Sequence, residues 1–120
     1  MENFTYGSYI ELGGGIRHVG VEDVTTEYPQ SEHMIDTLES LFREQAHKHE
    51  CKATAIVCDV RVKVPDRNRN SDAVQVRLDH VAGYSTEVFF PYEVGKDEIL
   101  YGESFSYKGQ GTIFRHHELQ

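Results

Sequence analysis

Apolar side chains recur at every second position through most of residues 53–94, and this spacing constrains the fold more than any other feature of the chain. Successive side chains of a β-strand point to opposite faces, so the alternation predicts antiparallel strands with one covered and one solvated face. With a short strand at 112–114, the pattern predicts a meander of four to five strands. The apolar rows are Ile56, Cys58, Val60, Val62 and Val64; Val74, Val76 and Leu78; Thr86, Val88, Phe90, Tyr92 and Val94; and Ile99, Tyr101, Phe105 and Tyr107.

A helical spacing precedes the alternating region. Ser31 is a suitable N-cap residue, and Glu32 and Asp36 place negative charge near the positive end of the helix dipole. We expect one amphipathic helix over about residues 31–49, packed on the apolar face of the sheet, with His49 inside its apolar stripe. The other members of the stripe are Met34, Ile35, Leu38, Leu41, Phe42 and Ala46.

The N-terminal segment predicts a β-hairpin. Residues 4–12 are rich in aromatic and β-branched types, residues 13–15 are three glycines, and residues 16–21 form the return strand. A phosphate-binding loop would need a helix directly after the glycines, and the sequence that follows is typical of a strand. The expected fold is therefore α+β: an N-terminal hairpin, one helix and an antiparallel meander.

Size and charge restrict the function classes. The 120 residues are 38% hydrophobic, which suits a single globular domain over residues 1–120. A formal net charge of −8 repels phosphate backbones and argues against nucleic-acid binding. No apolar run approaches the roughly 18 residues of a membrane span, and the start lacks a signal-peptide pattern. We expect a soluble, cytoplasmic protein without membrane contact, whose Cys51 and Cys58 are not joined in a disulfide.

Turn chemistry and apolar matching predict the strand registers. A three-residue loop at 81–83 with glycine last pairs His80 with Tyr84, and a loop at 95–98 joins the next two strands. Across the polar loop at 65–70, we align the apolar rows of the two strands. The expected opposite pairs are Val76 with Val88, Val74 with Phe90, Val94 with Ile99, Tyr92 with Tyr101, Val62 with Val74, and Asp59 with Arg77.

Glu103 is the clearest polar residue at a predicted core position. It continues the row Val62, Val74, Phe90, and a carboxylate buried there could act as a general acid or anchor a ligand. Together with Tyr92, Tyr101 and Phe105 it would line a small-molecule pocket between helix and sheet. The alternative is that an irregularity at Gly102 turns Glu103 outward.

Cys58 and His80 form a second candidate pair. The predicted registers place His80 beside Ile56 and diagonal to Cys58, and a histidine that reaches the sulfur could produce a thiolate nucleophile. The alternative is that Cys58, between valines, is a small buried hydrophobe.

The segment His47-Lys48-His49-Glu50-Cys51 contains several metal-ligating residue types. On a helix, residues two apart point in different directions, so His47 and His49 cannot share an ion there. We expect no metal site and no cofactor.

The function that we expect is a non-catalytic protein-interaction module of an adaptor, chaperone-like or immunity-like kind. The negative charge makes a basic protein the natural partner, and uncovered strand edges lead us to expect a homodimer. The alternative is a small-molecule-binding domain with the Glu103 pocket. A small enzyme that uses Glu103, or Cys58 with His80, is the third hypothesis.

Overall fold

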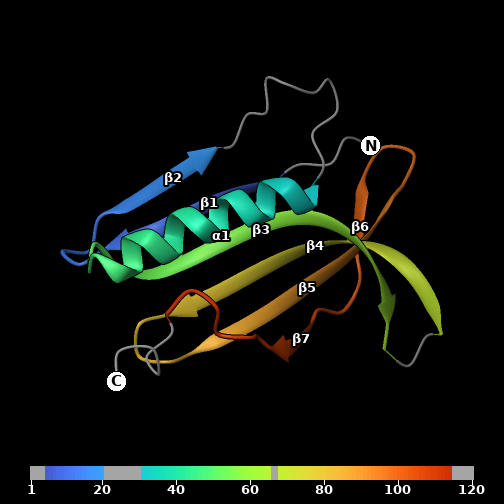
Figure 1. Ribbon diagram of the computed structural model, residues 1–120. Helices are drawn as coiled ribbons and strands as arrows, with labels where there is room; N and C mark the ends of the chain where they lie inside the picture. The colour runs from blue at the N-terminus through green and yellow to red at the C-terminus, as the bar shows by residue number, and fades with distance from the viewer. Residues whose placement is uncertain (1–4, 21–30, 66–67, 115–120) are drawn as a thin grey trace.

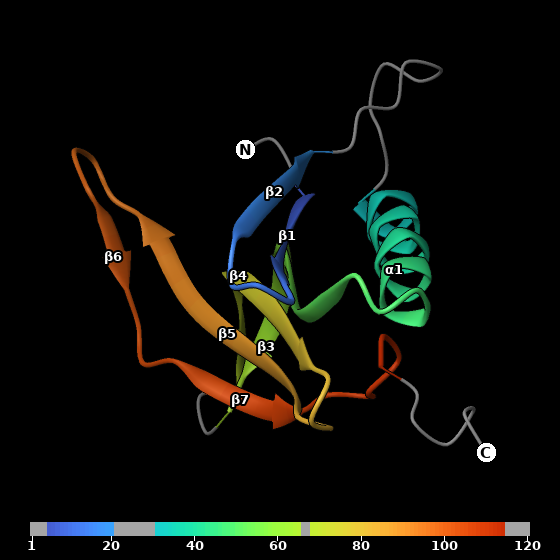
Figure 2. The same cartoon turned by 90° about the vertical axis from the view of Figure 1, so that its left-hand side faces the viewer.

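A computed structural model describes residues 5–20, 31–65 and 68–114, and it confirms the α+β fold. One helix packs on one face of an antiparallel sheet, and an N-terminal hairpin precedes it (Figures 1 and 2). The elements are β1 (Thr5–Glu11), β2 (Ile16–Gly20), α1 (Ser31–His47), β3 (Cys51–Val64), β4 (Arg69–His80), β5 (Ser85–Val94), β6 (Ile99–Tyr101) and β7 (Phe105–Lys108).

The sheet has the order β2-β1-β3-β4-β5-β6, and β7 pairs with β5 on the same edge as β6. β1 therefore lies between β2 and β3, although the helix separates β1 from β3 along the chain. Within the described residues, no helix is long and apolar enough to cross a lipid bilayer.

The core lies between α1 and the strands β1 and β3. Ile35, Leu38 and Phe42 of the predicted stripe are buried against Ile56 and Cys58. Phe42 also packs edge-to-face on Tyr9, with ring centroids 6.0 Å apart. The expected strand at 112–114 does not form, but Ile113 is buried in the same core and brings the C-terminal segment to the helix.

Gly7 of β1 lies directly beneath Phe42 and Leu38 of the helix. A Cβ atom at this position would lie 2.6 Å from Cζ of Phe42 and 3.1 Å from Cδ2 of Leu38. The missing side chain of Gly7 therefore makes room for the Phe42 ring.

The helix ends at His47, and His49 is exposed, so its predicted place in the apolar stripe is wrong. The backbone N–H of His49 donates to the carbonyl of Ala46, and that of Glu50 donates to the carbonyl of Gln45. This is a Schellman C-cap, in which His49 occupies the left-handed position with φ of 59°.

The registers that depend on short turns are confirmed. Val76 lies opposite Val88 and Val74 opposite Phe90, and the backbone N–H of His80 donates to the carbonyl of Tyr84. On the other side of β5, Val94 pairs with Ile99 and Tyr92 with Tyr101.

The predicted register between β3 and β4 is wrong. Val62 lies opposite Ser71 in place of Val74, an offset of three residues, and Asp59 lies opposite Val74 in place of Arg77. An offset by an odd number of residues moves every side chain of a strand to the opposite face of the sheet. The even-numbered residues of β3 face the helix, whereas Val74, Val76 and Leu78 of β4 project from the opposite face.

We call the two sides of the sheet the helix face and the far face. The register places Val57, Val76 and Val88 in one row on the far face, and Cys58, Gln75 and Phe89 in one row on the helix face. Apolar residues consequently occur on both faces, although the sequence had predicted one apolar face.

Glu103 lies between β6 and β7 and is exposed, so its predicted position inside the core is wrong. The pairing of β5 with the strands that follow it is interrupted between β6 and β7, beside Pro91. The backbone N–H of Gly102 donates to the carbonyl of Pro91, but proline has no N–H to donate in return. Since both backbone groups of a strand residue point to the same neighbour, the ladder is interrupted here.

Candidate functional site

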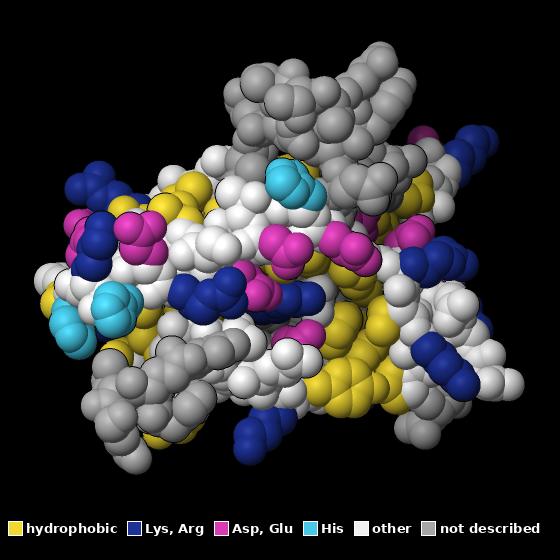
Figure 3. Space-filling model, viewed as in Figure 1, with side chains coloured by type: hydrophobic (Ala, Val, Ile, Leu, Met, Phe, Trp, Pro, Cys, Tyr) yellow, Lys and Arg dark blue, Asp and Glu magenta, His cyan; other side chains and the backbone are white. Residues whose placement is uncertain are grey.

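The first candidate site is a cavity of about 340 Å³ at the junction of β5, β6 and β7. Hydrophobic side chains gather over this part of the sheet, beside the helix (Figure 3). Pro91, Leu100 and Phe105 contribute apolar surface, and Glu93 and Glu103 contribute carboxylates. No residue of α1 lines the cavity, so it does not lie between helix and sheet as the predicted pocket would.

Two of the residues that line this cavity form an ion pair. Nη1 of Arg69 lies 3.2 Å from Oε1 of Glu93, and both side chains are more than half exposed. An exposed ion pair contributes little to stability, so a charged ligand could compete with either partner at little cost. The cavity thus combines apolar lining residues with charges that solvent already reaches.

The structure brings the four predicted pocket residues to this one cavity, but not in the predicted orientation. By register, Tyr92 and Tyr101 project from the far face, whereas Phe105 lies on the helix face and stacks on Phe89 at 5.1 Å. The hydroxyl of Tyr92 donates to Oδ1 of Asp59 at 2.8 Å. Burial, together with this hydrogen bond to the carboxylate, raises the pKa of Tyr92 to about 12.

Cys58 and His80 are not brought together. Cys58 lies on the helix face with no exposed surface, and its thiol donates to Oε1 of Gln75 at 3.2 Å. Burial raises the pKa of the Cys58 thiol, which opposes formation of a thiolate nucleophile. His80 lies on the far face opposite Ala53, and its Nδ1 accepts from the backbone N–H of Ala82 in the adjacent turn.

The other two sequence motifs have local structural roles. Gly14 has φ of 103° in the turn between β1 and β2, and a strand follows the three glycines. His47 and His49 are exposed while Cys51 is buried. Among the residues that the structure describes, no three His, Cys, Asp or Glu side chains gather to hold a metal ion.

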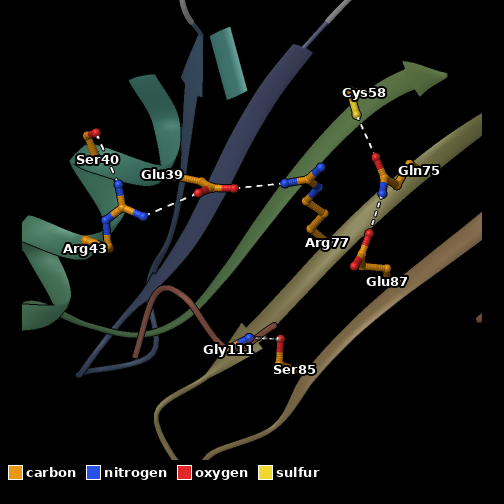
Figure 4. A network of polar contacts seen from close by, with 9 residues as sticks. All are labelled: Glu39, Ser40, Arg43, Cys58, Gln75, Arg77, Ser85, Glu87 and Gly111. Atoms are coloured by element: carbon orange, nitrogen blue, oxygen red, sulfur yellow. Dashed lines mark hydrogen bonds and ion pairs between the residues drawn. The ribbon is translucent and has the colours of Figure 1, made fainter. Parts of the chain in front are cut away.

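A polar network under the helix is a feature that the sequence did not predict (Figure 4). Glu39 of α1 accepts from Arg77 of β4 at 2.8 Å and from Arg43 of its own helix at 3.4 Å. Beside it, Gln75 accepts from Cys58 and donates to Glu87 at 2.7 Å. The correct register of β3 and β4 would have revealed the network, because it puts Gln75 and Arg77 on the helix face.

A second cavity, of about 180 Å³, adjoins this network between α1, β4 and the C-terminal segment. Asp79 lines it, and burial is the main reason why the pKa of this carboxyl is raised. The neighbouring charges are already paired: Glu39 is held between two arginines from different elements. We therefore assign the network a structural role, which is to join the helix to the sheet.

The far face is the third candidate. Among the residues that the structure describes, twelve large hydrophobic side chains are exposed. By register, seven of them project from the far face: Tyr6, Ile16, Leu78, Phe90, Val94, Ile99 and Tyr101. Single exposed apolar residues are normal on a protein surface, but a concentration of them on one sheet face favours an interaction surface.

The chain matches no protein-family model, no curated protein and no solved structure.

Proposed function

We propose that the protein is a non-catalytic interaction module that binds another polypeptide through the far face of its sheet. The observation that carries this proposal is the concentration of exposed apolar residues on that face. Apolar and aromatic side chains dominate the centres of protein–protein interfaces. The geometry of Cys58 and His80 supports a binding role over nucleophilic catalysis, since the two residues lie on opposite faces.

A photo-crosslinking amino acid at two positions tests the proposal in living cells. Phe90 is on the far face, and Tyr84 is an even more exposed aromatic residue in the turn between β4 and β5. We expect a covalent adduct with a polypeptide when the crosslinker replaces Phe90, and little or none when it replaces Tyr84. Equal adduct formation at both positions, or none at Phe90, would contradict a binding role for the far face.

A second candidate function is small-molecule binding in the larger cavity. Its volume of about 340 Å³ falls within the range of ligand pockets. Apolar Leu100 and Phe105 beside the carboxylates of Glu93 and Glu103 favour a ligand that joins a ring to an amine.

Phenethylamine is a suitable probe for this second function, with amide NMR shifts as the readout. We expect the signals of Leu100 and Phe105 to move on titration, and Glu103→Gln to weaken binding. Glu98→Gln is the matched control, because Glu98 is exposed in the preceding turn and does not line the cavity. Unchanged spectra at millimolar probe, or equal effects of the two variants, would exclude the site for such amines.

A further inference from the structure

We infer that the far face binds a second copy of this chain, so that two sheets pack face to face in a homodimer. This inference rests on the proposed function, because it names the polypeptide that the far face would bind. Area, charge and hydrogen bonding on the face each support a second copy as the partner.

The exposed apolar area matches what one partner of a stable dimer contributes. The seven exposed residues of the face show 39–68% of their surface. Ile16 lies apart, on the edge strand β2; with about 150–250 Å² for a whole large side chain, the fractions of the other six amount to roughly 600 Å². Val57, Val74, Val76 and Val88 are half-buried on the same face and add to it. A standard interface buries about 800 Å² per partner.

The charge of the far face favours a neutral partner. By register it carries two acidic side chains, Asp59 and Asp72, and three basic ones, Arg61, Lys63 and Lys108. The formal charge of the whole chain is −8, so most of the acidic residues lie elsewhere. A basic partner would find no excess of carboxylates on this face, whereas a second copy meets a near-neutral surface.

Three pairs of polar side chains on the far face are bonded to each other. Tyr92 donates to Asp59, Arg61 donates to Asp72 at 3.2 Å, and Ser8 lies 2.7 Å from the ring of His18. Buried polar groups are costly when they lack a partner. Because each of these groups already has a partner within one copy, covering them costs less than covering unpaired groups would.

The row Tyr6, Val57, Val76 and Val88 crosses four adjacent strands and lies within this surface. In a symmetric dimer the same patch is used by both copies, and residues near the two-fold axis meet their own counterparts. We place Val76 close to that axis, with the two sheets about 10 Å apart.

Light scattering after size-exclusion chromatography of the purified full-length chain tests the dimer. We expect twice the mass of 13.8 kDa for the wild type. Leu78→Lys should weaken association by about 100-fold or more, because both copies carry the change. Leu100→Lys is the matched control: Leu100 is similarly exposed but projects from the helix face. It should leave the dimer intact, and circular dichroism should show that both variants are folded.

A cysteine variant locates the axis. Cys51 and Cys58 are both buried, so a cysteine added at the half-buried Val76 or at the exposed Asp36 is the thiol that reacts first. Under mild oxidation Val76→Cys should link two copies, whereas Asp36→Cys on the exposed side of the helix should not. A linked Asp36→Cys with an unlinked Val76→Cys would place the interface elsewhere and overturn the inference.

The outcomes separate the inference from the proposed function. A monomeric wild type whose Phe90 crosslinks to a different protein overturns the homodimer and leaves the interaction module standing. A monomer without any Phe90 adduct overturns both. If Leu100→Lys disrupts the dimer and Leu78→Lys leaves it intact, the two copies meet through the helix face, and the inference is overturned.

Discussion

Replacement of Gly7 by alanine tests whether helix and sheet meet as the structure describes. The added Cβ would lie 2.6 Å from Cζ and 2.8 Å from Cε2 of Phe42, well inside van der Waals contact. Phe42 has no exposed surface, so its ring cannot turn away without displacing Leu38 or Tyr9. The backbone of β1 cannot retreat freely either, because β2 and β3 hold it on both sides.

The expected cost is that of overpacking a closed core, about 1–3 kcal/mol. Alanine in a strand otherwise gains about 0.5–1 kcal/mol over glycine from the lower entropy of the unfolded chain. We therefore expect Gly7→Ala to lower the free energy of unfolding by about 1–2 kcal/mol. With a urea dependence of about 2 kcal/mol per molar, the middle of the usual range, the unfolding midpoint should fall by roughly 0.5–1 M.

Two further variants make the test specific. Gly20→Ala is the matched control, because Gly20 is also a strand glycine and nothing lies within 4 Å of its added Cβ. It should be neutral or slightly stabilising. In a Phe42→Leu background, which lacks the clashing ring atoms, Gly7→Ala should cost at least about 1 kcal/mol less. If Gly7→Ala and Gly20→Ala unfold at the same urea concentration, the described packing of α1 on β1 is wrong.

Three further predictions follow from local features. His49→Gly should stabilise the fold by about 0.5–1 kcal/mol in urea unfolding, because it relieves a left-handed non-glycine residue; a loss of stability would show that the His49 side chain contributes more than the strain costs. Tyr92 should ionise near pH 12, and Tyr92→Phe should remove this late step from the ultraviolet titration. Because the folded state raises its pKa from 10.0, Tyr92 should destabilise the fold as pH rises from 10 to 12. Asp79→Asn should raise the urea midpoint at pH 7, because the folded state raises the pKa of this carboxyl above 3.8 and therefore disfavours its charged form. The gain in stability should vanish below pH 3.8, where Asp79 is protonated in both states. A gain that persists there would refute the charge-based explanation.

The sequence was sufficient to predict the strand registers where short turns restrict the pairing. The loops at 81–83 and 95–98 allow few geometries, and the registers on both sides of β5 are as expected. The loop between β3 and β4 is longer and polar, so the alignment depended on matching Val62 with Val74. That match assumed a single apolar face, which is the assumption that the structure contradicts.

The placement of Glu103 failed for a different reason. Alternation between Tyr101 and Phe105 suggested one continuous strand, but Pro91 on the neighbouring strand cannot complete the ladder. Pro91 was visible in the sequence, and proline in a strand is a known signal of a broken or edge pairing. The cavity forms beside this break in the pairing. Pro91 would therefore have located the cavity more reliably than the position of Glu103 in the predicted apolar row did.

The interior position of β1 has a consequence for synthesis of the chain. β1 and α1 share a core whose other wall is β3, with Ile56 and Cys58 beneath Leu38 and Phe42. The 17 residues after His47, through Val64, must be translated before that wall is complete, which takes roughly 1–3 s at typical elongation rates. During this interval the apolar stripe of the nascent helix is open to ribosome-associated chaperones. Strand β1 is then paired with β2 alone, because β3 has not yet been made. Mutations in β3 should therefore affect the yield of folded protein during translation more than their effect on equilibrium stability would suggest.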